Sequence, residues 1–373
     1  MGVAAATLAT RTGADLHAQA AGQPFATLSP APALSLAGDA DSNSPAVWEL
    51  FRGQPVLFVL TSVAGQAQNS VGPSLDRLRA LPHVAFSTAA PLGGFWIESV
   101  IEAGGVWYGY YHNEVADLVC PGSGKVVPRI GAARSTDRGR TWADLGTILE
   151  APLSTMQCNT RNHYFHGGVG DFSAVLDRDE QYLYFHYTQY LEQDGWLGVS
   201  VARMPWADRD APVGRMTVWH NGAWLPARPE VVREPDDDEE EGEGGGEIIV
   251  ESWIYPFATP VHAAVDRWDN RTSAVDVYWG AAVHWNTALG VYVMLLNRAI
   301  SNDWKQGGIY ISYNPDVEDP AGWSRPTLLL NGGRWYPQVM GLTPGEGTDK
   351  VAGATARFFM SGRSEHLIRF GRR

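Results

Sequence analysis

The sequence predicts an all-β protein that folds as a five-bladed β-propeller, with four-stranded antiparallel blades around a central channel. Helical periodicity is scarce, whereas short runs of Val, Ile, Tyr, Trp and Phe bounded by Gly, Asp, Asn and Pro recur throughout. The 41 Gly and 23 Pro suit many short strands joined by tight turns. One strand pattern occurs five times along the 373 residues. A β-sandwich is the alternative, but copies of about sixty residues fit blades better than sandwich strands spaced about 8 to 12 residues apart.

Each copy starts with a polar residue beside an apolar strand, followed by a turn, an aromatic strand and a strand with small residues. The first copy comprises Ser44 to Leu50 and Pro55 to Ser62. The second, the clearest, comprises Phe95 to Ile101, Val106 to His112, Arg129 to Ser135 and a closing strand to Leu149. The third comprises Gly170 to Leu176, Tyr182 to Thr188, Gly198 to Met204 and Met216 to His220. Since the first strand of each blade lines the channel, its polar residues are expected to converge there.

The fourth copy comprises Gly280 to Asn286, Val291 to Asn297, Gly308 to Tyr313 and Pro326 to Leu330, and the fifth comprises Trp335 to Gly341, Ala356 to Gly362 and His366 to Phe370. The fifth lacks a clear fourth strand. A strand from the N-terminal segment 1–35, around Pro24 to Leu28, would complete the last sheet and remove an open edge. Residues 36–373 are then one propeller domain.

The net charge is −13, and no basic cluster is visible, so a nucleic-acid partner is not expected. Much of the negative charge lies in the run from Glu234 to Glu247. Such a run repels itself and has nothing to bury, which predicts a disordered acidic insertion at about 228–250. No stretch approaches the roughly 18 apolar residues of a membrane span. The composition leaves the oligomeric state open.

The two cysteines, Cys120 and Cys158, flank loops rich in Gly, Pro and Asn. A disulfide between them is favoured, with two free thiols as the alternative, and a zinc site with His163 and His166 lacks a recognised ligand spacing. The disulfide is plausible if the protein is exported, and a secreted or periplasmic location is favoured, although the N-terminus has no basic region before its short apolar run and is a poor signal peptide.

Three carboxylates fall on or just before predicted innermost strands: Asp41, Glu98 and Asp171. Hydrolysis of a glycosidic bond needs one carboxylic acid to protonate the leaving oxygen and one carboxylate to activate water or attack carbon. The third carboxylate could raise the pKa of the acid, because crowded carboxylates cannot all ionise freely. The predicted chemistry is therefore acid/base cleavage of an oligo- or polysaccharide.

The D-S-N-S-P-A-V-W opening, the W-I-E strand and the V-G-D-F-S strand resemble the five-bladed propeller glycoside hydrolases that include arabinanases, β-xylosidases and invertases. The resemblance spans roughly residues 38–370 as architecture. It implies that Asp41 is the base or nucleophile, Glu98 the acid and Asp171 the modulator of its pKa. In the arabinanase pattern the Glu follows the second Asp, so the roles of Glu98 and Asp171 could be exchanged.

Two of the three acids also have a structural interpretation. Asp41, in D-A-D-S-N-S-P, could cap a turn, and Asp171 after Gly-Val-Gly could be a turn residue. Glu98 lies between Trp96-Ile97 and Val100-Ile101, where an ionised carboxylate needs a partner or a function. Glu114, at the end of the next strand, is a weaker candidate.

The segment S-T-D-R-G-R-T-W, Ser135 to Trp142, resembles the Asp-box of sialidases. That resemblance implies a hairpin turn between the third and fourth strands of a blade, with Ser135, Asp137, Gly139 and Trp142 in structural roles. A sialidase would also need three arginines, for which Arg129, Arg298 and Arg363 can be named without an order.

Sugar binding needs aromatic platforms and polar groups. Candidates on or beside inner strands are Trp96, His112, His166, His284, Trp285, Arg298, Trp335 and Tyr336. The chemistry requires no cofactor. In the arabinanase-like group an axial His accompanies a metal ion, so His284 is a candidate for a structural Ca²⁺ at the axis, with a hydrogen-bonded core histidine as the alternative.

Two further functions are open. The propeller could bind carbohydrate without cleaving it, its acids bonding only to hydroxyls. It could also be a polysaccharide lyase with His112, His284 or Tyr336 as base, which would need a basic pocket for an acidic sugar.

Overall fold

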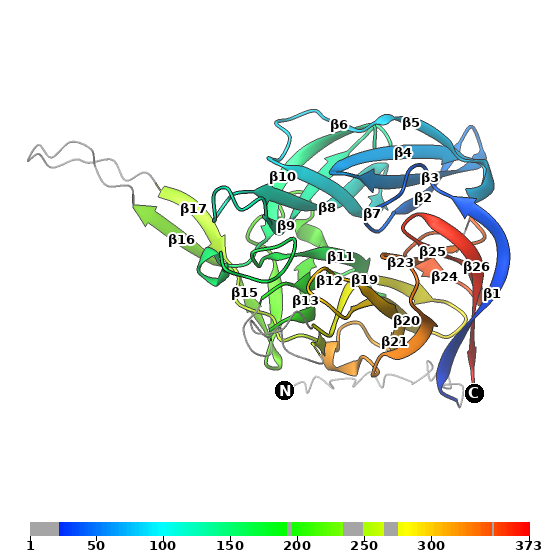
Figure 1. Ribbon diagram of the computed structural model, residues 1–373. Coiled ribbons are helices and arrows are strands. Elements are labelled where there is room, and N and C mark those ends of the chain that lie inside the picture. Colours follow the sequence, from blue (N-terminus) through cyan, green and yellow to red (C-terminus); the bar gives the residue numbers. More distant parts are fainter. Residues whose placement is uncertain (1–21, 192–195, 234–248, 265–274, 345–346) are drawn as a thin grey trace, which may run out of the picture.

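The structure is a computed structural model that describes residues 22–191, 196–233, 249–264, 275–344 and 347–373. Its five main antiparallel sheets surround a common axis, which confirms the predicted five-bladed propeller (Figure 1). Blade 1 contains β2 (Ala46–Phe51), β3 (Gln54–Val63), β4 (Gln66–Gly72) and β5 (Arg79–His83). Blade 2 contains β7 (Gly94–Ala103), β8 (Val106–Ala116), β9 (Val126–Ser135) and β10 (Thr141–Leu149), with β6 (Ala85–Phe86) beside β10.

The next two blades carry extra short strands. Blade 3 contains β11 (Val169–Leu176), β12 (Tyr182–Gln189), β13 (Gly198–Pro205) and β14 (Thr217–His220), with β15 (Ala223–Pro226) and β18 (His262–Ala263) attached. Blade 4 contains β19 (Val277–Asn286), β20 (Val291–Ala299), β21 (Gln306–Asn314) and β22 (Thr327–Asn331), with β24 (Val351–Ala352) beside β19. Four 3₁₀ turns occur among the described residues, at Leu75–Arg77, Leu153–Thr155, Trp206–Asp208 and Pro320–Gly322. None of the described helices has the length and apolar character needed to cross a membrane.

Blade 5 joins the two ends of the described chain. It contains β23 (Pro337–Gly341), β25 (Thr355–Met360), β26 (Arg363–Arg372) and β1 (Pro24–Ser35). β1 pairs antiparallel with β26, from Pro24 opposite Arg372 to Ser35 opposite Arg363. This pairing agrees with the hypothesis that a strand from the first 35 residues completes the last sheet, and it covers the edge that β26 would otherwise expose.

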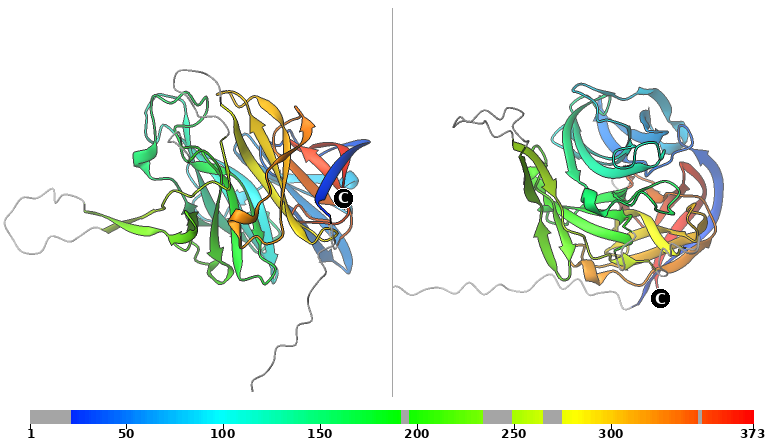
Figure 2. Two further views of the ribbon diagram at one scale, coloured as in Figure 1. Left: turned by 90° about the horizontal axis from the view of Figure 1, so that it is seen from below. Right: turned by 60° about the vertical axis from the view of Figure 1, so that its left-hand side comes forward.

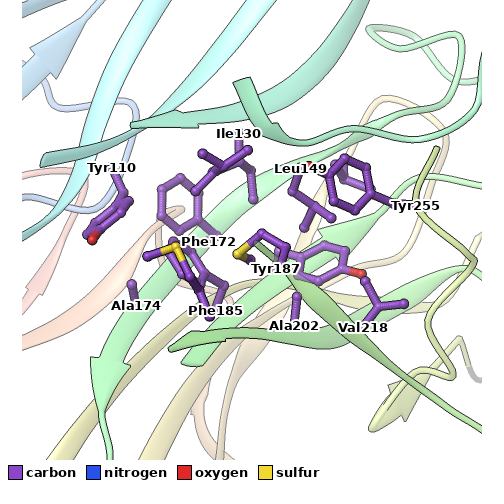
Figure 3. Close-up of a cluster of buried hydrophobic side chains, with 14 of the residues drawn as sticks. Tyr110, Ile130, Leu149, Phe172, Ala174, Phe185, Tyr187, Ala202, Val218 and Tyr255 are labelled. Atoms are coloured by element: carbon purple, nitrogen blue, oxygen red, sulfur yellow. The ribbon is translucent and has the colours of Figure 1, made fainter. Parts of the chain in front are cut away.

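Buried side chains fill the space between each pair of neighbouring blades. Between blades 2 and 3, for example, Tyr110 and Ile130 pack against Phe172 and Phe185 (Figure 3). Corresponding clusters lie between blades 1 and 2, 3 and 4, 4 and 5, and 5 and 1. Face-to-face packing of this kind makes β2, β7, β11, β19 and β23 the strands nearest the axis.

The turn between β9 and β10 is held by the Ser135 to Trp142 segment. The Asp137 carboxylate accepts hydrogen bonds from the backbone N–H groups of Arg140 and Thr141 and from the Thr141 hydroxyl. Gly139 has a φ of 72°, and Trp142 is fully buried between blades 1 and 2. These contacts hold the turn between β9 and β10.

The insertion predicted at about 228–250 starts and ends in ordered backbone. β16 (Arg228–Arg233) pairs with β17 (Ile249–Ile254), and this two-stranded ribbon projects from the ring (Figure 2). The prediction of disorder is thus corrected at both ends of the range, because the flanking residues form a ladder of backbone hydrogen bonds. The acidic residues 234–248 lie outside the described residues.

Candidate active site

Local irregularities in three inner strands place side chains at one end of the axis. The β7–β8 pairing shifts register between Ile97 and Ser99, and the β11–β12 pairing shifts between Gly170 and Phe172. β19 shifts at a corresponding level, between Trp279 and Ala282. A bulge adds one residue to a strand and redirects its side chain, and here the residues within the first two bulges are Glu98 and Asp171.

Asn43 joins these irregular strands across the axis. Its side-chain Nδ2 donates to the carbonyl oxygens of Phe172, at 2.8 Å, and Ala281, at 3.1 Å. The same nitrogen lies 3.5 Å from Oε2 of Glu98. This buried amide therefore ties blade 1 to blades 2, 3 and 4 at the level of the acids.

A cavity of about 440 Å³ opens at this end of the axis, and it brings together all three predicted acids. Its lining also contains four of the predicted binding residues, namely Trp96, His112, Trp335 and Tyr336. Further lining side chains that carry polar or aromatic groups are Glu114, His163, Tyr164, Phe165, Trp279 and Trp304.

Glu98 is fully buried in the wall of this cavity. Its Oε2 accepts a hydrogen bond from the backbone N–H of Phe172, at 3.0 Å. Its Oε1 has no hydrogen-bond partner of good geometry among the described residues and lies 3.5 Å from Nδ1 of His112. Burial, partly offset by the interaction with His112, raises the pKa of Glu98 to about 7, and the charge of Asp171 adds to the rise.

Asp171 is held by two tyrosines. The hydroxyl of Tyr190 donates to its Oδ2, and the hydroxyl of Tyr336 donates to its Oδ1 at 3.1 Å. Burial raises the pKa of Asp171, while His112 and the tyrosine hydroxyls act in the opposite direction. Each carboxylate oxygen thus accepts one hydrogen bond. The residue also has a φ of 41°, a left-handed conformation that the bulge imposes.

His112 lies among three carboxylates. Its Nε2 is 3.3 Å from Glu114, and in the neutral ring its Nδ1 accepts the backbone N–H of Asp171 at 2.9 Å. Burial alone would lower the pKa of His112, but Glu114, Glu98 and Asp171 together raise it well above its usual value. Glu98, His112 and Asp171 are close enough together to suggest a metal site. A metal ion here would compete with existing hydrogen bonds, because the backbone N–H of Asp171 already uses the Nδ1 lone pair of the neutral His112 ring and each Asp171 oxygen already accepts a tyrosine hydroxyl.

Asp41 is less buried than the other two acids. Its Oδ1 accepts from the indole N–H of Trp96 at 2.7 Å, and its Oδ2 accepts from the backbone N–H of Ala64 at 3.0 Å. Burial raises its pKa, and these two hydrogen bonds lower it in part. The contacts fix the carboxylate at the cavity, beside an aromatic side chain.

Four predicted binding residues lie elsewhere, and the prediction is corrected for them. Arg298, on β20 of blade 4, is bound to the carboxylate of Asp276 and the hydroxyl of Tyr310. His166 is buried in a loop, with Nε2 2.7 Å from the Ser123 hydroxyl. Partners from neighbouring segments thus already bond to both side chains.

His284 and Trp285 lie toward the far end of β19, because the cavity end of this strand is Trp279. Trp285 packs against Tyr292, and the guanidinium of Arg178 lies 4.4 Å from its ring centre. His284 is buried against Phe370, and burial together with the charge of Lys350 lowers its pKa to about 3. A Ca²⁺ beside His284 fits poorly, because the fixed charge near this imidazole is itself positive.

Sequence reasoning missed much of the aromatic wall. Trp279 lies three residues into β19, before the predicted start of that strand, and Trp304 follows β20 in a turn. The available signal for these two residues was a tryptophan that borders a glycine or a turn at the end of a strand.

The Cys120–Cys158 disulfide is present and confirms the predicted bond. It joins two loops near Gly124 and His163, which line the cavity.

The three arginines of the sialidase alternative do not meet. Arg129 bonds to Asn113, Arg363 pairs with Asp39, and Arg298 pairs with Asp276. None of them lines the cavity, and the described lining includes neither arginine nor lysine.

No family model matches the chain, and no curated protein matches it. Among solved structures, it is similar to an endo-arabinase from Bacteroides thetaiotaomicron, with 12% identity over 90% of this chain and 95% of that one, at a TM-score of 0.47. It is also similar to an α-L-arabinofuranosidase from Lactobacillus brevis (12% identity, 87% and 89% covered, TM-score 0.47) and to an exo-β-1,3-galactanase from Phanerochaete chrysosporium (11% identity, 93% and 64% covered, TM-score 0.46). These similarities are too slight to carry an argument about activity.

Proposed function

We propose that the protein hydrolyses glycosidic bonds of an oligo- or polysaccharide, with Glu98 as the acid, Asp41 as the base or nucleophile and Asp171 as the modulator. The observation that carries the proposal is the state of Glu98. A carboxyl group with a pKa near 7, in the wall of a cavity that a second, less buried carboxylate shares, is suited to protonate a leaving oxygen at neutral pH.

The contacts of the acids support this division of roles. Oε1 of Glu98 is the carboxylate oxygen among the three acids that no good hydrogen bond occupies, so it can carry the proton. Asp171 is bonded at both oxygens and is suited to act through its charge on Glu98. Asp41 accepts two N–H hydrogen bonds, which favour the ionised form that a base or nucleophile requires.

The lining of the cavity supports a neutral sugar. Four carboxylates and several aromatic rings line it, and the described residues there include neither lysine nor arginine. An acidic sugar would meet these like charges, and the sialidase and lyase alternatives have no lysine or arginine among the described lining residues to hold a substrate carboxylate. Indole and phenol rings provide the apolar faces on which neutral sugar rings stack.

The test compares wild-type protein with Glu98→Gln on aryl glycosides and on oligosaccharides of neutral sugars. The variant should lose a factor of about 10² to 10⁴ in kcat on oligosaccharides, and much less on aryl glycosides whose phenols leave without a proton. That contrast marks a general acid, because misfolding would reduce both activities equally.

Glu102→Gln is the matched control, since Glu102 lies on the same strand and bonds to the backbone of an exposed turn. If wild-type protein binds a glycan but releases no product from any substrate, the binding propeller replaces the hydrolase. Growth of ultraviolet absorbance from unsaturated products would instead indicate a lyase.

A further inference from the structure

A lysine side chain occupies the channel beyond the acids. The ammonium of Lys350 lies 3.0 Å from the hydroxyl oxygens of both Ser99 and Ser173, and 3.0 Å from Oδ2 of Asp349. Its side chain is 11% exposed and that of Asp349 is 4% exposed, so this ion pair is largely removed from water. Three acceptors satisfy the three donors of the ammonium.

The partners of Lys350 come from different blades. Ser99 belongs to β7 and Ser173 to β11, while Lys350 precedes β24 in the connection between β23 and β25. Ser173 also accepts the backbone N–H of Val283 on β19, at 3.1 Å. Asp349 accepts the backbone N–H of Ala46 on β2, at 2.9 Å. One ion pair thus connects the inner strands of blades 1 to 4 with a segment of blade 5.

The two serines that contact Lys350 lie close to the acids in the sequence. Ser99 directly follows Glu98, and Ser173 comes two residues after Asp171. The hydroxyl of Ser99 also accepts the backbone N–H of Ala174, at 2.9 Å, which locks β7 to β11 immediately beyond both bulges. A shift of either serine would therefore be transmitted to the carboxyl groups.

We infer that Lys350 is the built-in axial cation of this propeller: its ammonium joins the inner strands and positions Glu98, in place of a metal ion at the axis. A buried lysine is costly unless every proton is bonded and its charge is paired, and both conditions hold here. The effect on the ring is independent of the proposed function, whereas the effect on catalysis depends on it.

The experiment measures thermal unfolding of the full chain with and without EDTA and CaCl₂, together with metal content by elemental analysis. Wild-type protein should contain no stoichiometric metal, and neither addition should move its midpoint. Lys350→Met should lower the midpoint by roughly 5 to 10 °C, because it leaves Asp349 buried without its partner. Lys350→Arg should recover part of the loss.

A matched control is Lys305→Met, since Lys305 is exposed in the turn before β21, and this variant should unfold like the wild type. If Lys350→Met does not fold, the double variant Lys350→Met with Asp349→Asn removes the unpaired charge. Its unfolding midpoint is then compared with that of Lys305→Met. A bound metal whose removal lowers the wild-type midpoint, or a Lys350→Met variant as stable as wild type, would overturn the inference.

Catalysis supplies a separate readout. His112 and Asp171 both act on the pKa of Glu98, so a displacement of Glu98 through Ser99 should move the alkaline limb of the kcat/KM profile by about half a pH unit or more in Lys350→Met. If the wild type has no hydrolase activity, the unfolding results still decide whether Lys350 holds the axis. If activity exists but the limb does not move, Lys350 has no positioning role for Glu98.

Discussion

A single side chain, Glu98, combines two properties that rarely coexist: it is fully buried, and one of its oxygens has no good hydrogen-bond partner among the described residues. Its apolar neighbours in the sequence were enough to single it out. The sequence could not show that His112 and the backbone of Phe172 would meet it, because these contacts depend on the packing of one blade against the next. Tyr190, which holds Asp171, left no recognisable pattern for the same reason.

The activity should follow the protonation of Glu98. Its pKa is raised to about 7, so the acid form is present below that pH and kcat/KM should fall about tenfold per pH unit above it. At low pH the activity should fall again as Asp41 takes up a proton. This fall should begin at a higher pH than for an ordinary aspartate, because burial raises the pKa of Asp41. A pH profile of kcat/KM checks both limbs.

The effect of His112 on Glu98 predicts the direction in which the alkaline limb should move when His112 is replaced. Its interaction with Glu98 lowers the pKa of that carboxyl, so His112→Asn should move the alkaline limb to higher pH. A limb that stays in place, or one that moves down, would show that another group controls it.

At the scale of elements, the site depends on bulges that interrupt regular strands. Alternating apolar residues predicted β7 and β11 correctly, yet a regular alternation does not show which residue will turn toward the axis. β19 shows the error that follows. A predicted start at Gly280 omits Trp279, and it places His284 and Trp285 at the cavity although they lie at the other end of the strand. Gly280 itself has a φ of 57° and marks the bulge.

The bulge in β11 also requires a glycine beside Asp171. A Cβ atom at Gly170 would lie 2.5 Å from Cε1 of His112 and 3.1 Å from Pro128. Gly170→Ala should therefore displace His112, lower the free energy of unfolding by about 1 to 3 kcal/mol and reduce kcat/KM. Denaturant unfolding and steady-state kinetics on the same preparation test this.

The control for this variant is Gly222→Ala, where φ is 87° and a Cβ would have no neighbour within 4 Å. It should lose only the stability that an alanine costs at a positive φ, and it should keep wild-type activity. Equal losses of activity in the two variants would contradict the close contact at His112.

At the scale of the whole molecule, the repeated strand pattern was sufficient to predict the ring, because each blade shows its own alternation and turns. The contents of the axis were not predictable in this way. Asn43 and Lys350 come from connecting segments, where neither periodicity nor a motif indicates what a side chain will reach. Three buried histidines likewise contact aromatic rings of neighbouring blades: His186 meets Trp323, His262 meets Tyr278 and His284 meets Phe370.

These histidines should make the ring sensitive to acid. Burial lowers the pKa of His186 to about 3, that of His262 to about 4 and that of His284 to about 3, against about 6.5 in the unfolded chain. Above pH 6.5 or so neither state is protonated, and below it the unfolded chain binds more protons. Glu98, with its pKa raised to about 7, acts in the opposite direction, but the three histidines outnumber it, so stability should decline as the pH falls from about 6.5 toward 4.

Calorimetry at a series of pH values measures this decline. His284→Leu removes one of the three groups and should unfold with a shallower dependence on pH over the same interval. An unchanged slope would assign the acid sensitivity to other groups.

Closure of the ring through β1 and β26 has a consequence for biosynthesis. The ribosome makes β1 before any blade exists, and its partner strand emerges only after the other four blades have been synthesised. During that interval β1 and the growing stack of sheets each present unpaired backbone, and a neighbouring nascent chain on the same messenger could pair with either. Exchange of β1 between two copies is therefore the misassembly to expect when this protein is produced quickly.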